Sequence, residues 1–457
     1  MILFLFSFEI CRAQQWFPLE GGLSGSNSQT DKVAAMCTDS VNHILYVGGK
    51  FLRANDSINV YSIAKWNGIN WEQLISHGDT IIAPGDTGLI QYATSTTSLV
   101  IHNSNLYSTV ENGNFHSIIE INLNSFVRRG IGYLNGTVNQ LYVYEDTLYA
   151  CGAFTIVNNT YGGTNYPISG IAKWDGTQWL EVGGGISVGG FSEVNALCVH
   201  HNKLYAAGIF ENAGGTYCKN IACWNDTSWN AVGNGIGFAG DFGVILMALE
   251  SYHGKLYAGG FFDFTATGFA HCMAVWNDTT WASAGINPGG VYTLKTLDDK
   301  LYMGAPNGGR YASVFNDTIW TMIPNGPTYN VFCFEKLDSN IYSGGNFNIV
   351  NDSTPCGLIA RYHPTLIQDT TAIVEVKQNG STINIYPNPA TNEIKITNLS
   401  PTENQISIFN LIGQQVKSIR VSHAQTTTIP VSDLPAGIYV VTIFDGEKIV
   451  CKKLVKE

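Results

Sequence analysis

An internal repeat constrains the fold of this chain more than any other feature. An apolar residue followed by tyrosine recurs seven times, at Leu45-Tyr46, Leu106-Tyr107, Leu148-Tyr149, Leu204-Tyr205, Leu256-Tyr257, Leu301-Tyr302 and Ile341-Tyr342. The copies recur about every 49 residues, a period typical of supersecondary units that each contribute one small sheet. A single unit of this size cannot bury its apolar face alone, so the copies must pack on one another.

Each repeat reads as four short strands. The first strand is an alternating run such as residues 194–200, the second is the Leu-Tyr segment, and the third and fourth usually carry one tryptophan each. Between the last two strands stand residue pairs that tolerate the positive φ of a tight turn. Five such pairs predict hairpins: Asn67-Gly68, Asp175-Gly176, Asn225-Asp226, Asn277-Asp278 and Asn316-Asp317.

The two ends of the repeat region complement each other. The seventh copy ends at residues 359–362 without a fourth strand, whereas residues 16–22 read like a fourth strand followed by its glycine-rich loop. If the N-terminal strand completes the last sheet, the ring of sheets closes and no edge is left open. The sequence therefore predicts an all-β fold, with a seven-bladed β-propeller over residues 14–364 that is closed by its N-terminal strand.

The repeat resembles the kelch and galactose-oxidase type of propeller. A glycine pair ends the second strand in LYVGGKF and LYAGGFF, and a spaced aromatic pair follows. The spacing here is Trp-x4-Trp, which is tighter than the usual kelch spacing, so we describe the repeat as kelch-like. The resemblance covers the ring and implies its fold but not an activity.

The first 13 residues predict a signal peptide. Residues 2–8 are a short apolar run, and the small residues of Cys11-Arg12-Ala13 suit cleavage by a signal peptidase. We therefore expect a secreted protein whose mature chain starts near Gln14.

Composition changes after Pro364. A polar linker is expected over residues 365–381, followed by short alternating strands over residues 382–457, which predict a small Ig-like β-sandwich. Four motifs occur there in order, at residues 383–390, 406–414, 434–441 and 453–456.

These four motifs resemble the C-terminal sorting domain (type A) of the type IX secretion system of Bacteroidetes. The resemblance implies export through the type IX secretion machinery, removal of the domain, and either release or attachment to surface lipopolysaccharide. It also implies that the basic and apolar tail is the sorting signal, here Lys453, Leu454, Val455 and Lys456. The alternative is an ordinary Ig-like binding module.

Charge and cysteine usage narrow the possible functions. The chain has 35 acidic and 24 basic residues, and the net charge of −11 lies entirely in residues 1–364. An acidic body without a basic stripe disfavours nucleic-acid binding. Nine of the ten cysteines remain after signal removal, and most occupy small or apolar slots of the repeat, so we expect structural thiols.

No cofactor and no metal are expected from sequence motifs. No His-x-His or His-Glu-x-x-His motif occurs, and His200-His201 on one strand would point to opposite faces, which makes joint ligation of one ion difficult. A metal site assembled from separate blades stays open.

The longer loops of the repeat indicate where a ligand would bind. Connections between the second and third strands, and between successive repeats, emerge on one rim of a propeller, and long loops on a rigid scaffold often carry function. That rim would present aromatic residues beside carboxylates: Tyr161, Tyr166, Phe191, Glu193, Glu211, Tyr217, Phe238, Asp241, Asp263 and Phe264. Such a set suits sugar stacking with hydroxyl hydrogen bonds, or a protein partner, although the same residues could only pack the loops.

The leading hypothesis is a non-catalytic binding module for an extracellular glycan or protein, because no catalytic constellation is visible in the sequence. The alternative is an extracellular carbohydrate-active enzyme with carboxylates gathered from several blades, which would leave no linear motif. A purely structural surface protein is the third possibility.

Overall fold

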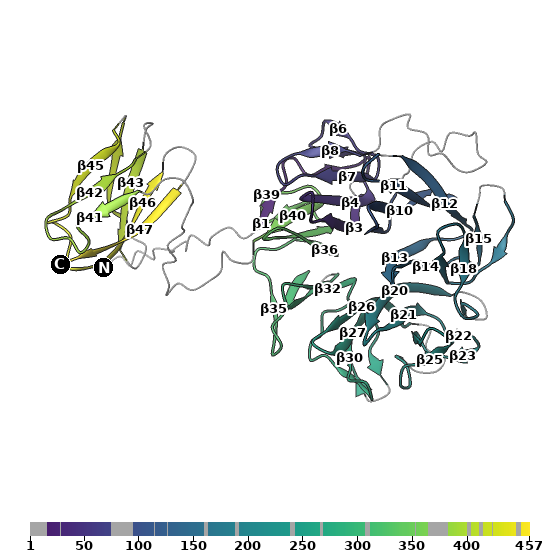
Figure 1. Cartoon of the computed structure of the whole chain (residues 1–457). Helices are drawn as coiled ribbons and strands as arrows, with labels where there is room; N and C mark the ends of the chain where they lie inside the picture. Colours follow the sequence, from purple (N-terminus) through teal and green to yellow (C-terminus); the bar gives the residue numbers. More distant parts are fainter. Residues whose placement is uncertain are drawn as a thin grey trace. The chain divides into compact units, whose positions relative to one another are not determined.

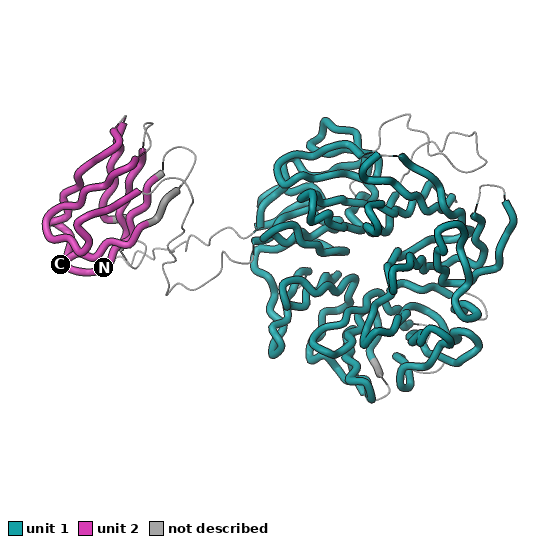
Figure 2. Tube along the Cα trace, viewed as in Figure 1, with its two compact units in different colours: residues 1–366 teal, residues 367–457 magenta. Residues whose placement is uncertain are grey.

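The computed structural model describes residues 16–27, 29–74, 95–113, 115–125, 127–159, 163–187, 192–237, 243–265, 268–306, 311–351, 353–363, 383–399, 404–410, 415–422, 424–444 and 449–457. The chain divides into two compact units, Met1–Leu366 and Ile367–Glu457 (Figure 2). The expected signal peptide and the expected linker lie outside the described residues. Within the described part of the chain, no helix is long and apolar enough to cross a membrane.

Unit 1 is built from antiparallel sheets, each named here after its first strand. The β3 sheet contains β3 (Lys32–Asp39), β4 (Ile44–Lys50), β7 (Ile63–Trp66) and β8 (Trp71–Gln73). The β9 sheet contains β9 (Leu99–His102), β10 (Asn105–Asn112), β11 (Phe115–Asn122) and β12 (Arg128–Leu134), and β15 (Ile156–Asn158) and β16 (Tyr166–Pro167) extend it. The β13 sheet contains β13 (Val138–Tyr144), β14 (Thr147–Gly152), β17 (Ile171–Trp174) and β18 (Trp179–Glu181).

The remaining four-stranded sheets of unit 1 follow the same order. The β20 sheet contains β20 (Glu193–His200), β21 (Lys203–Ile209), β24 (Ile221–Trp224) and β25 (Trp229–Ala231). The β26 sheet contains β26 (Ile245–Tyr252), β27 (Lys255–Phe261), β30 (Met273–Trp276) and β31 (Trp281–Ser283). The β32 sheet contains β32 (Thr293–Leu297), β33 (Lys300–Gly304), β34 (Ala312–Phe315) and β35 (Trp320–Met322). The β36 sheet contains β36 (Val331–Leu337), β37 (Asn340–Gly345), β40 (Ile359–Tyr362) and β1 (Trp16–Pro18).

The first strands of these sheets lie innermost around a common centre (Figure 1). Each first strand contacts the first strand of the next sheet along the chain, and β36 contacts β3. Four-stranded antiparallel sheets arranged in this way are the architecture of a β-propeller. The all-β prediction is confirmed.

Short two-residue strands form hairpins between the second and third strands of several sheets. They are β5 (Arg53–Ala54) with β6 (Ile58–Asn59), β22 (Asn212–Ala213) with β23 (Thr216–Tyr217), β28 (Phe264–Thr265) with β29 (Gly268–Phe269), and β38 (Ile349–Val350) with β39 (Thr354–Pro355). Two connections between successive sheets, β2 (Leu23–Ser24) and β19 (Ile186–Ser187), pair with β5 and β22. We call the end of the propeller that carries these hairpins and β15–β16 the hairpin rim, and the opposite end, with the short turns, the turn rim.

The predicted hairpins of the turn rim are confirmed by the strand register. In the β20 sheet Trp224 pairs with Trp229, and the turn between them has Asp226 at a φ of 68°. The Oδ1 atom of Asn225 accepts hydrogen bonds from the backbone N–H groups of Thr227 and Ser228, at 3.2 and 2.9 Å. The asparagine side chain and the left-handed conformation of aspartate together explain the Asn-Asp pair.

The second tryptophan of several repeats links neighbouring sheets. Nε1 of Trp179 donates to the carbonyl oxygen of Ile131 at 2.7 Å, that of Trp229 to Val182 at 3.0 Å, and that of Trp281 to Val232 at 3.1 Å. In each case the acceptor belongs to the outer strand of the preceding sheet or to the residue after it. The aromatic pair therefore has two roles: its rings fill the space between sheets, and its indole joins them.

The first described strand lies next to the last strand of unit 1. Trp16 is opposite Tyr362 in the pairing of β1 with β40, and their ring centroids are 5.0 Å apart. Trp16 is fully buried, and its carbonyl oxygen accepts a hydrogen bond of 2.8 Å from Nδ2 of Asn351. The chain thus joins its N-terminal strand to a sheet whose other strands come more than 300 residues later.

Unit 2 consists of two antiparallel sheets around one apolar core. One sheet contains β41 (Asn384–Tyr386), β42 (Glu393–Thr397) and β45 (Thr426–Pro430). The other contains β44 (Gln415–Val421), β43 (Asn404–Asn410), β46 (Gly437–Phe444) and β47 (Ile449–Lys456). Ile394, Ile408 and Val441 are buried in the shared core.

Candidate functional site

A central cavity of about 900 Å³ runs between the innermost strands of unit 1. Side chains from β3, β9, β13, β20, β26, β32 and β36 line it. Most of the lining is apolar, because the first strands also pack against their neighbours. Five charged side chains interrupt it: Lys32, Glu193, Glu250, Lys295 and Glu335.

Glu250, Lys295 and Glu335 bring opposite charges together in this cavity. Nζ of Lys295 lies 3.5 Å from Oε2 of Glu335, and Oε1 of Glu250 accepts a hydrogen bond of 3.0 Å from the backbone N–H of Thr296. Burial raises the pKa of Glu250. Burial alone would lower the pKa of Lys295, but the carboxylates of Glu335 and Glu250 outweigh it and raise that pKa. The Lys295 side chain is 41% exposed, and this exposure is to the cavity.

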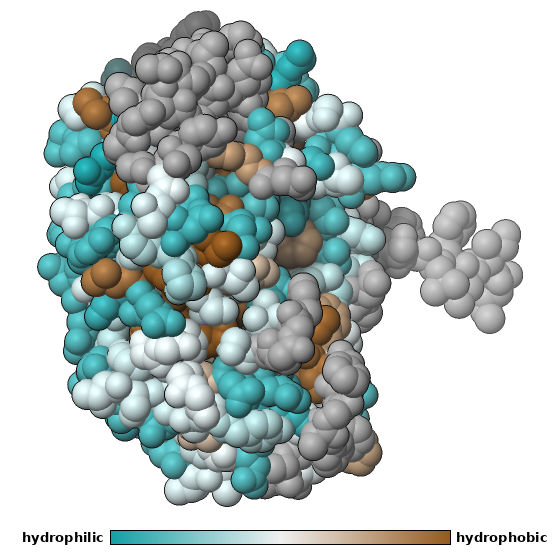
Figure 3. Space-filling model, turned by 90° about the vertical axis from the view of Figure 1, so that its right-hand side faces the viewer, coloured by the Kyte–Doolittle hydropathy of each residue, from teal (hydrophilic) through white to brown (hydrophobic). Residues whose placement is uncertain are grey.

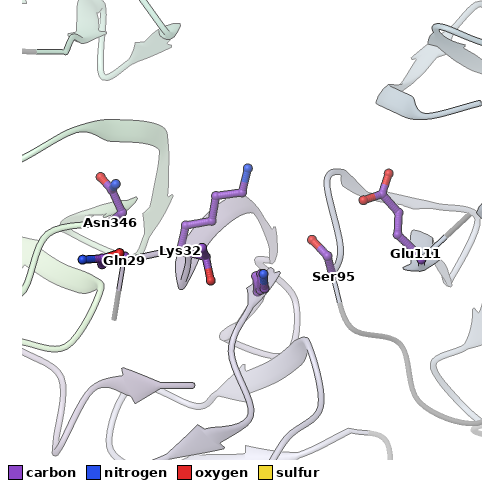
Figure 4. A pocket seen from close by; sticks show the side chains of 8 residues that line it. Gln29, Lys32, Ser95, Glu111 and Asn346 are labelled. Atoms are coloured by element: carbon purple, nitrogen blue, oxygen red, sulfur yellow. The ribbon is translucent and has the colours of Figure 1, made fainter. Parts of the chain in front are cut away.

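A smaller polar pocket of about 390 Å³ lies at the hairpin-rim end of the cavity. Its lining comes from three neighbouring sheets and their loops: Gln29, Thr30, Lys32, Lys50, Ser95, Glu111, Gly113 and Asn346. Figure 4 shows Lys32 between Gln29 and Asn346 on one side and Ser95 and Glu111 on the other. Lys32 lines both spaces, so the pocket and the central cavity are neighbours there.

We call this smaller pocket the mouth pocket. Its side chains suit the binding of a small polar group. Nζ of Lys32 lies 5.6 Å from the centre of the Phe332 ring, and burial lowers the pKa of its ammonium. Two ammonium groups, a carboxylate and amide side chains can together hydrogen-bond hydroxyl or carboxylate groups of a ligand.

The residues that the sequence predicts for ligand binding do not all lie at the same place in the propeller. Tyr166 and Tyr217 are exposed on β16 and β23 of the hairpin rim, and Glu211 and Asp263 are exposed at the beginning of hairpins. Glu193 is half-buried at the start of β20, where its Oε1 accepts a hydrogen bond of 2.8 Å from Nδ2 of Asn139, and it lines the central cavity.

Five other predicted residues cannot be placed as side chains. Tyr161, Phe191, Phe238 and Asp241 lie outside the described residues, and Phe264 is described only as part of β28. The structure therefore brings the predicted aromatic residues Tyr166 and Tyr217 to one rim, while Glu193 belongs to the cavity.

Phe269 is an exposed aromatic residue that the sequence analysis missed. It pairs with Phe264 as Tyr217 pairs with Asn212, and each of the two aromatic residues directly precedes a buried residue, Ala270 or Cys218. Phe269 is 62% exposed and Tyr217 is 54% exposed. Aligning the hairpins of successive repeats would have found this shared slot.

Apolar side chains among the described residues are scattered over the face of the molecule that Figure 3 draws. Figure 3 shows, on one face of the molecule, small separate apolar areas among polar residues.

Three charged residues of the cavity, Glu250, Lys295 and Glu335, were also missed. Glu250 is the one charged residue of β26 and Lys295 the one charged residue of β32, whereas Glu335 is followed by Lys336 in β36. That interruption was the available signal, because an innermost strand has both faces enclosed and charge there needs a partner.

Histidine and aspartate residues from neighbouring sheets meet along the turn rim. His43 Nδ1 lies 2.7 Å from Asp338 Oδ1, and His253 lies 2.7 Å from Asp299 and 2.8 Å from Asp317. The hydroxyl of Tyr144 donates to Asp226 at 3.0 Å. Turns of adjacent sheets are thus joined by polar contacts.

The expectation that His200 and His201 point apart is wrong. The strand β20 ends at His200, and His201 starts the following turn with a φ of 47°. This conformation stacks the two imidazole rings, with centroids 4.0 Å apart. The alternation of a strand does not continue into a left-handed residue.

Eight described cysteines are free thiols, and all except Cys272 are buried. Burial raises the pKa of Cys218 to about 11, so the thiol is the neutral form at physiological pH. Buried neutral thiols behave as small apolar side chains.

Solved structures with low sequence identity are similar to this chain. The propeller domain of the Trilobed protease from Pyrococcus furiosus is 12% identical, with a TM-score of 0.42 over 69% of this chain and 91% of that chain. Sqt1 of Saccharomyces cerevisiae is 10% identical, with a TM-score of 0.39 over 77% and 98%. The acylaminoacyl peptidase of Pyrococcus horikoshii is 10% identical, with a TM-score of 0.41 over 83% and 60%. A search of curated proteins found no match.

The C-terminal unit has a clear family. Residues 384–457 match the secretion system C-terminal sorting domain, which confirms that part of the prediction from the four motifs. A domain of this kind implies interaction with the type IX secretion machinery. The chain is therefore a β-propeller protein with a type IX sorting domain, and it is secreted to the outer surface or the extracellular space.

Proposed function

We propose that this protein is a secreted, non-catalytic module that binds an extracellular glycan on its hairpin rim. The observation that carries the proposal is the pair Tyr217 and Phe269, which occupy equivalent slots of neighbouring sheets and are both exposed. Tyr166 is exposed on the next hairpin in the other direction. Large exposed rings can stack on a ligand. Phe269 stacks on His271, with ring centroids 5.5 Å apart, and is still 62% exposed.

A glycan fits this arrangement better than a protein does. Sugar rings offer flat apolar faces for stacking and hydroxyl groups for hydrogen bonds, and the exposed carboxylates of Glu211 and Asp263 can accept such bonds. A polymer with a repeating unit can contact equivalent residues on successive sheets, so weak single contacts add up. The polar mouth pocket could then hold a chain end.

The scaffold in this proposal is a seven-bladed, kelch-like propeller over residues 14–364. Its support is the pairing of β1 with β40 and the contact of each innermost strand with the next, including β36 with β3. Residues 1–13 are the signal peptide, residues 365–381 the linker, and residues 382–457 the sorting domain with its signal in Lys453–Lys456. After export by a system of the Bacteroidetes kind, the domain is removed and the propeller is released or attached to lipopolysaccharide.

The test is glycan-array and soluble-polysaccharide binding by the purified chain. Replacing both rings, Tyr217→Ala with Phe269→Ala, is expected to weaken saturable binding at least tenfold, since each lost stacking contact contributes on the order of 1 kcal/mol. Ile319→Ala is the matched control, because Ile319 is an equally exposed apolar residue on the turn rim. Equal binding by the double variant and the parent would contradict the proposal.

A second candidate function is glycan cleavage within the central cavity. It is favoured by Glu250, a carboxyl group with a raised pKa, near a second carboxylate from another sheet. General acids in glycosidases have this property. Release of reducing sugar that is abolished by both Glu250→Gln and Glu335→Gln, and not by the ring variants, would establish this candidate instead.

A further inference from the structure

A cluster of two histidines and one aspartate lies on the turn rim, outside the proposed glycan site. His200 ends β20, His201 starts the adjoining turn, and Asp278 occupies the hairpin turn of the neighbouring β26 sheet. Asp278 has a φ of 69°. Its position therefore depends on the tight turn that Asn277-Asp278 forms between β30 and β31. Two sheets must therefore be in place for the cluster to form.

The donor atoms of the three side chains converge. Nε2 of His200 lies 3.2 Å from Oδ1 of Asp278, and Nδ1 of His201 lies 3.3 Å from Oδ2 of the same carboxylate. One ligand atom from each residue lies within 4.8 Å of the others. The contacts of 3.2 and 3.3 Å match the separation of donors around one ion that is bound at about 2.0–2.2 Å from each.

The buried member of the cluster is held in a fixed orientation. The His200 side chain is fully buried, and its Nδ1 forms a hydrogen bond of 2.8 Å with the hydroxyl of Ser251 on β26. That bond leaves Nε2 directed at Asp278. A partner on the second ring nitrogen is the usual support for a histidine that binds a metal.

The other two members are open to solvent. The side chains of His201 and Asp278 are about half exposed, at 54% and 49%. An ion can enter from that side, His201 can turn its ring toward the ion, and water can complete the coordination.

We propose that His200 Nε2, His201 Nδ1 and the carboxylate of Asp278 bind one divalent transition-metal ion. The expected ions are Cu²⁺, Ni²⁺ and Zn²⁺. Imidazole nitrogen with a carboxylate oxygen suits these ions. Ca²⁺ and Mg²⁺ prefer sites made only of oxygen ligands, so they are not the expected occupants. The ion would join the β20 and β26 sheets at the turn rim.

A neighbouring cluster of similar composition has a different geometry. His253 contacts Asp299 through Nε2 and Asp317 through Nδ1, at 2.7 and 2.8 Å. Its two carboxylates therefore lie on opposite sides of the ring and cannot share one ion with it. Among the described residues, the His200 cluster is the one whose donors gather around a single point. His253 is thus a matched control.

The test is titration of the whole chain, without an affinity tag, with ZnCl₂ by calorimetry, and with CuCl₂ followed by electron paramagnetic resonance. We expect one ion per chain to bind, with nitrogen hyperfine structure for copper. His201→Asn and Asp278→Asn should each weaken binding at least tenfold. Asparagine tolerates the positive φ at both positions, so folding is expected to be preserved, which thermal unfolding would check.

His253→Asn should leave the affinity unchanged. Equal affinity in all three variants would overturn the proposal, and so would an equal loss in the His253→Asn control or the absence of saturable binding by the parent chain. Failure here leaves the glycan proposal untouched, because the two sites lie on opposite rims and use different probes.

Discussion

At the scale of single residues, the repeated tryptophans do more than fill space. The indole of Trp229 is buried and bonded to the carbonyl oxygen of Val182 in the preceding sheet. The equivalent Trp71 is also buried, but among the described residues its Nε1 has no hydrogen-bond partner. Tryptophan in the same position of the repeat therefore forms an indole hydrogen bond in one sheet and none among the described residues in another. Comparing the two positions measures the contribution of that hydrogen bond.

We expect Trp229→Phe to cost about 1 kcal/mol more in free energy of unfolding than Trp71→Phe, since it alone breaks an indole hydrogen bond. The Val182 carbonyl oxygen keeps the hydrogen bond that it accepts from the backbone N–H of Gly185. Both replacements remove a similar volume, so the difference isolates the hydrogen bond. Chemical denaturation of the two variants measures it. Equal losses would mean that the indole bond contributes nothing to stability.

The charges in the central cavity give a second prediction for a single residue. Lys295→Met leaves the carboxylates of Glu335 and Glu250 without their cation, and we expect a loss of about 1–2 kcal/mol at pH 7, a value reduced for the partial exposure of Lys295. The raised pKa of Lys295 means that its contribution is present below the unfolded-state pKa of lysine and is lost as pH rises above it. At low pH the carboxylates become protonated, so the difference between variant and parent should shrink.

Thermal unfolding between pH 4 and pH 9 measures that difference. Lys336→Met is the control, because Lys336 pairs with Asp298 at the turn rim, where an exposed ion pair contributes about 0–1 kcal/mol. A Lys295→Met loss that does not change with pH would show that packing, and not charge, is responsible.

At the scale of elements, the strands could be predicted because their signals are local. Alternation, the Leu-Tyr pair and the Asn-Asp turn are each complete within about ten residues, and the register of Trp224 with Trp229 follows from them. His201 was misjudged because a strand ends one residue earlier than the pattern suggests. The exposed position of Phe269 could have been predicted, since it is equivalent to the position of Tyr217 in the preceding repeat.

The cavity could not be predicted in the same way. Glu250, Lys295 and Glu335 are about 40 residues apart in sequence, and only the arrangement of three innermost strands brings them together. The His200–Asp278 contact likewise depends on which sheets are neighbours. Contacts between sheets need the geometry of the ring, which no local pattern contains.

The N-terminal strand yields the prediction for an element. Trp16→Ala should cost about 3–5 kcal/mol, because it removes a fully buried ring that packs on Tyr362 and weakens the pairing of β1 with β40. An unpaired β40 would be an exposed sheet edge, so self-association is also expected. Differential scanning calorimetry and light scattering measure both effects.

Phe17→Ala is the control in the same strand. Phe17 is half-buried and contacts Arg361, whose guanidinium lies 5.5 Å from the ring. Its loss should cost clearly less and leave the protein monodisperse. If Trp16→Ala and Phe17→Ala behave alike, β1 does not hold the β36 sheet together.

At the scale of the whole molecule, each unit has apolar clusters of its own. The core of unit 2 is formed by residues such as Ile394, Ile408 and Val441, and the clusters of unit 1 contain residues of unit 1. If the sorting domain is removed after export, as proposed above, it must leave behind a protein that stays folded. Separate cores meet that requirement.

We therefore expect two separable unfolding transitions for the whole chain, and Ile408→Ala should lower only one of them. Ile408 is 1% exposed, and truncating a buried isoleucine costs about 2–5 kcal/mol, which in a unit of this size is a shift of many degrees. Calorimetry of parent and variant resolves the assignment, with Ile341→Ala as the reciprocal change in the core of unit 1. If either variant moves both transitions together, the units unfold cooperatively, and removal of the sorting domain would then have to weaken the propeller that it exported.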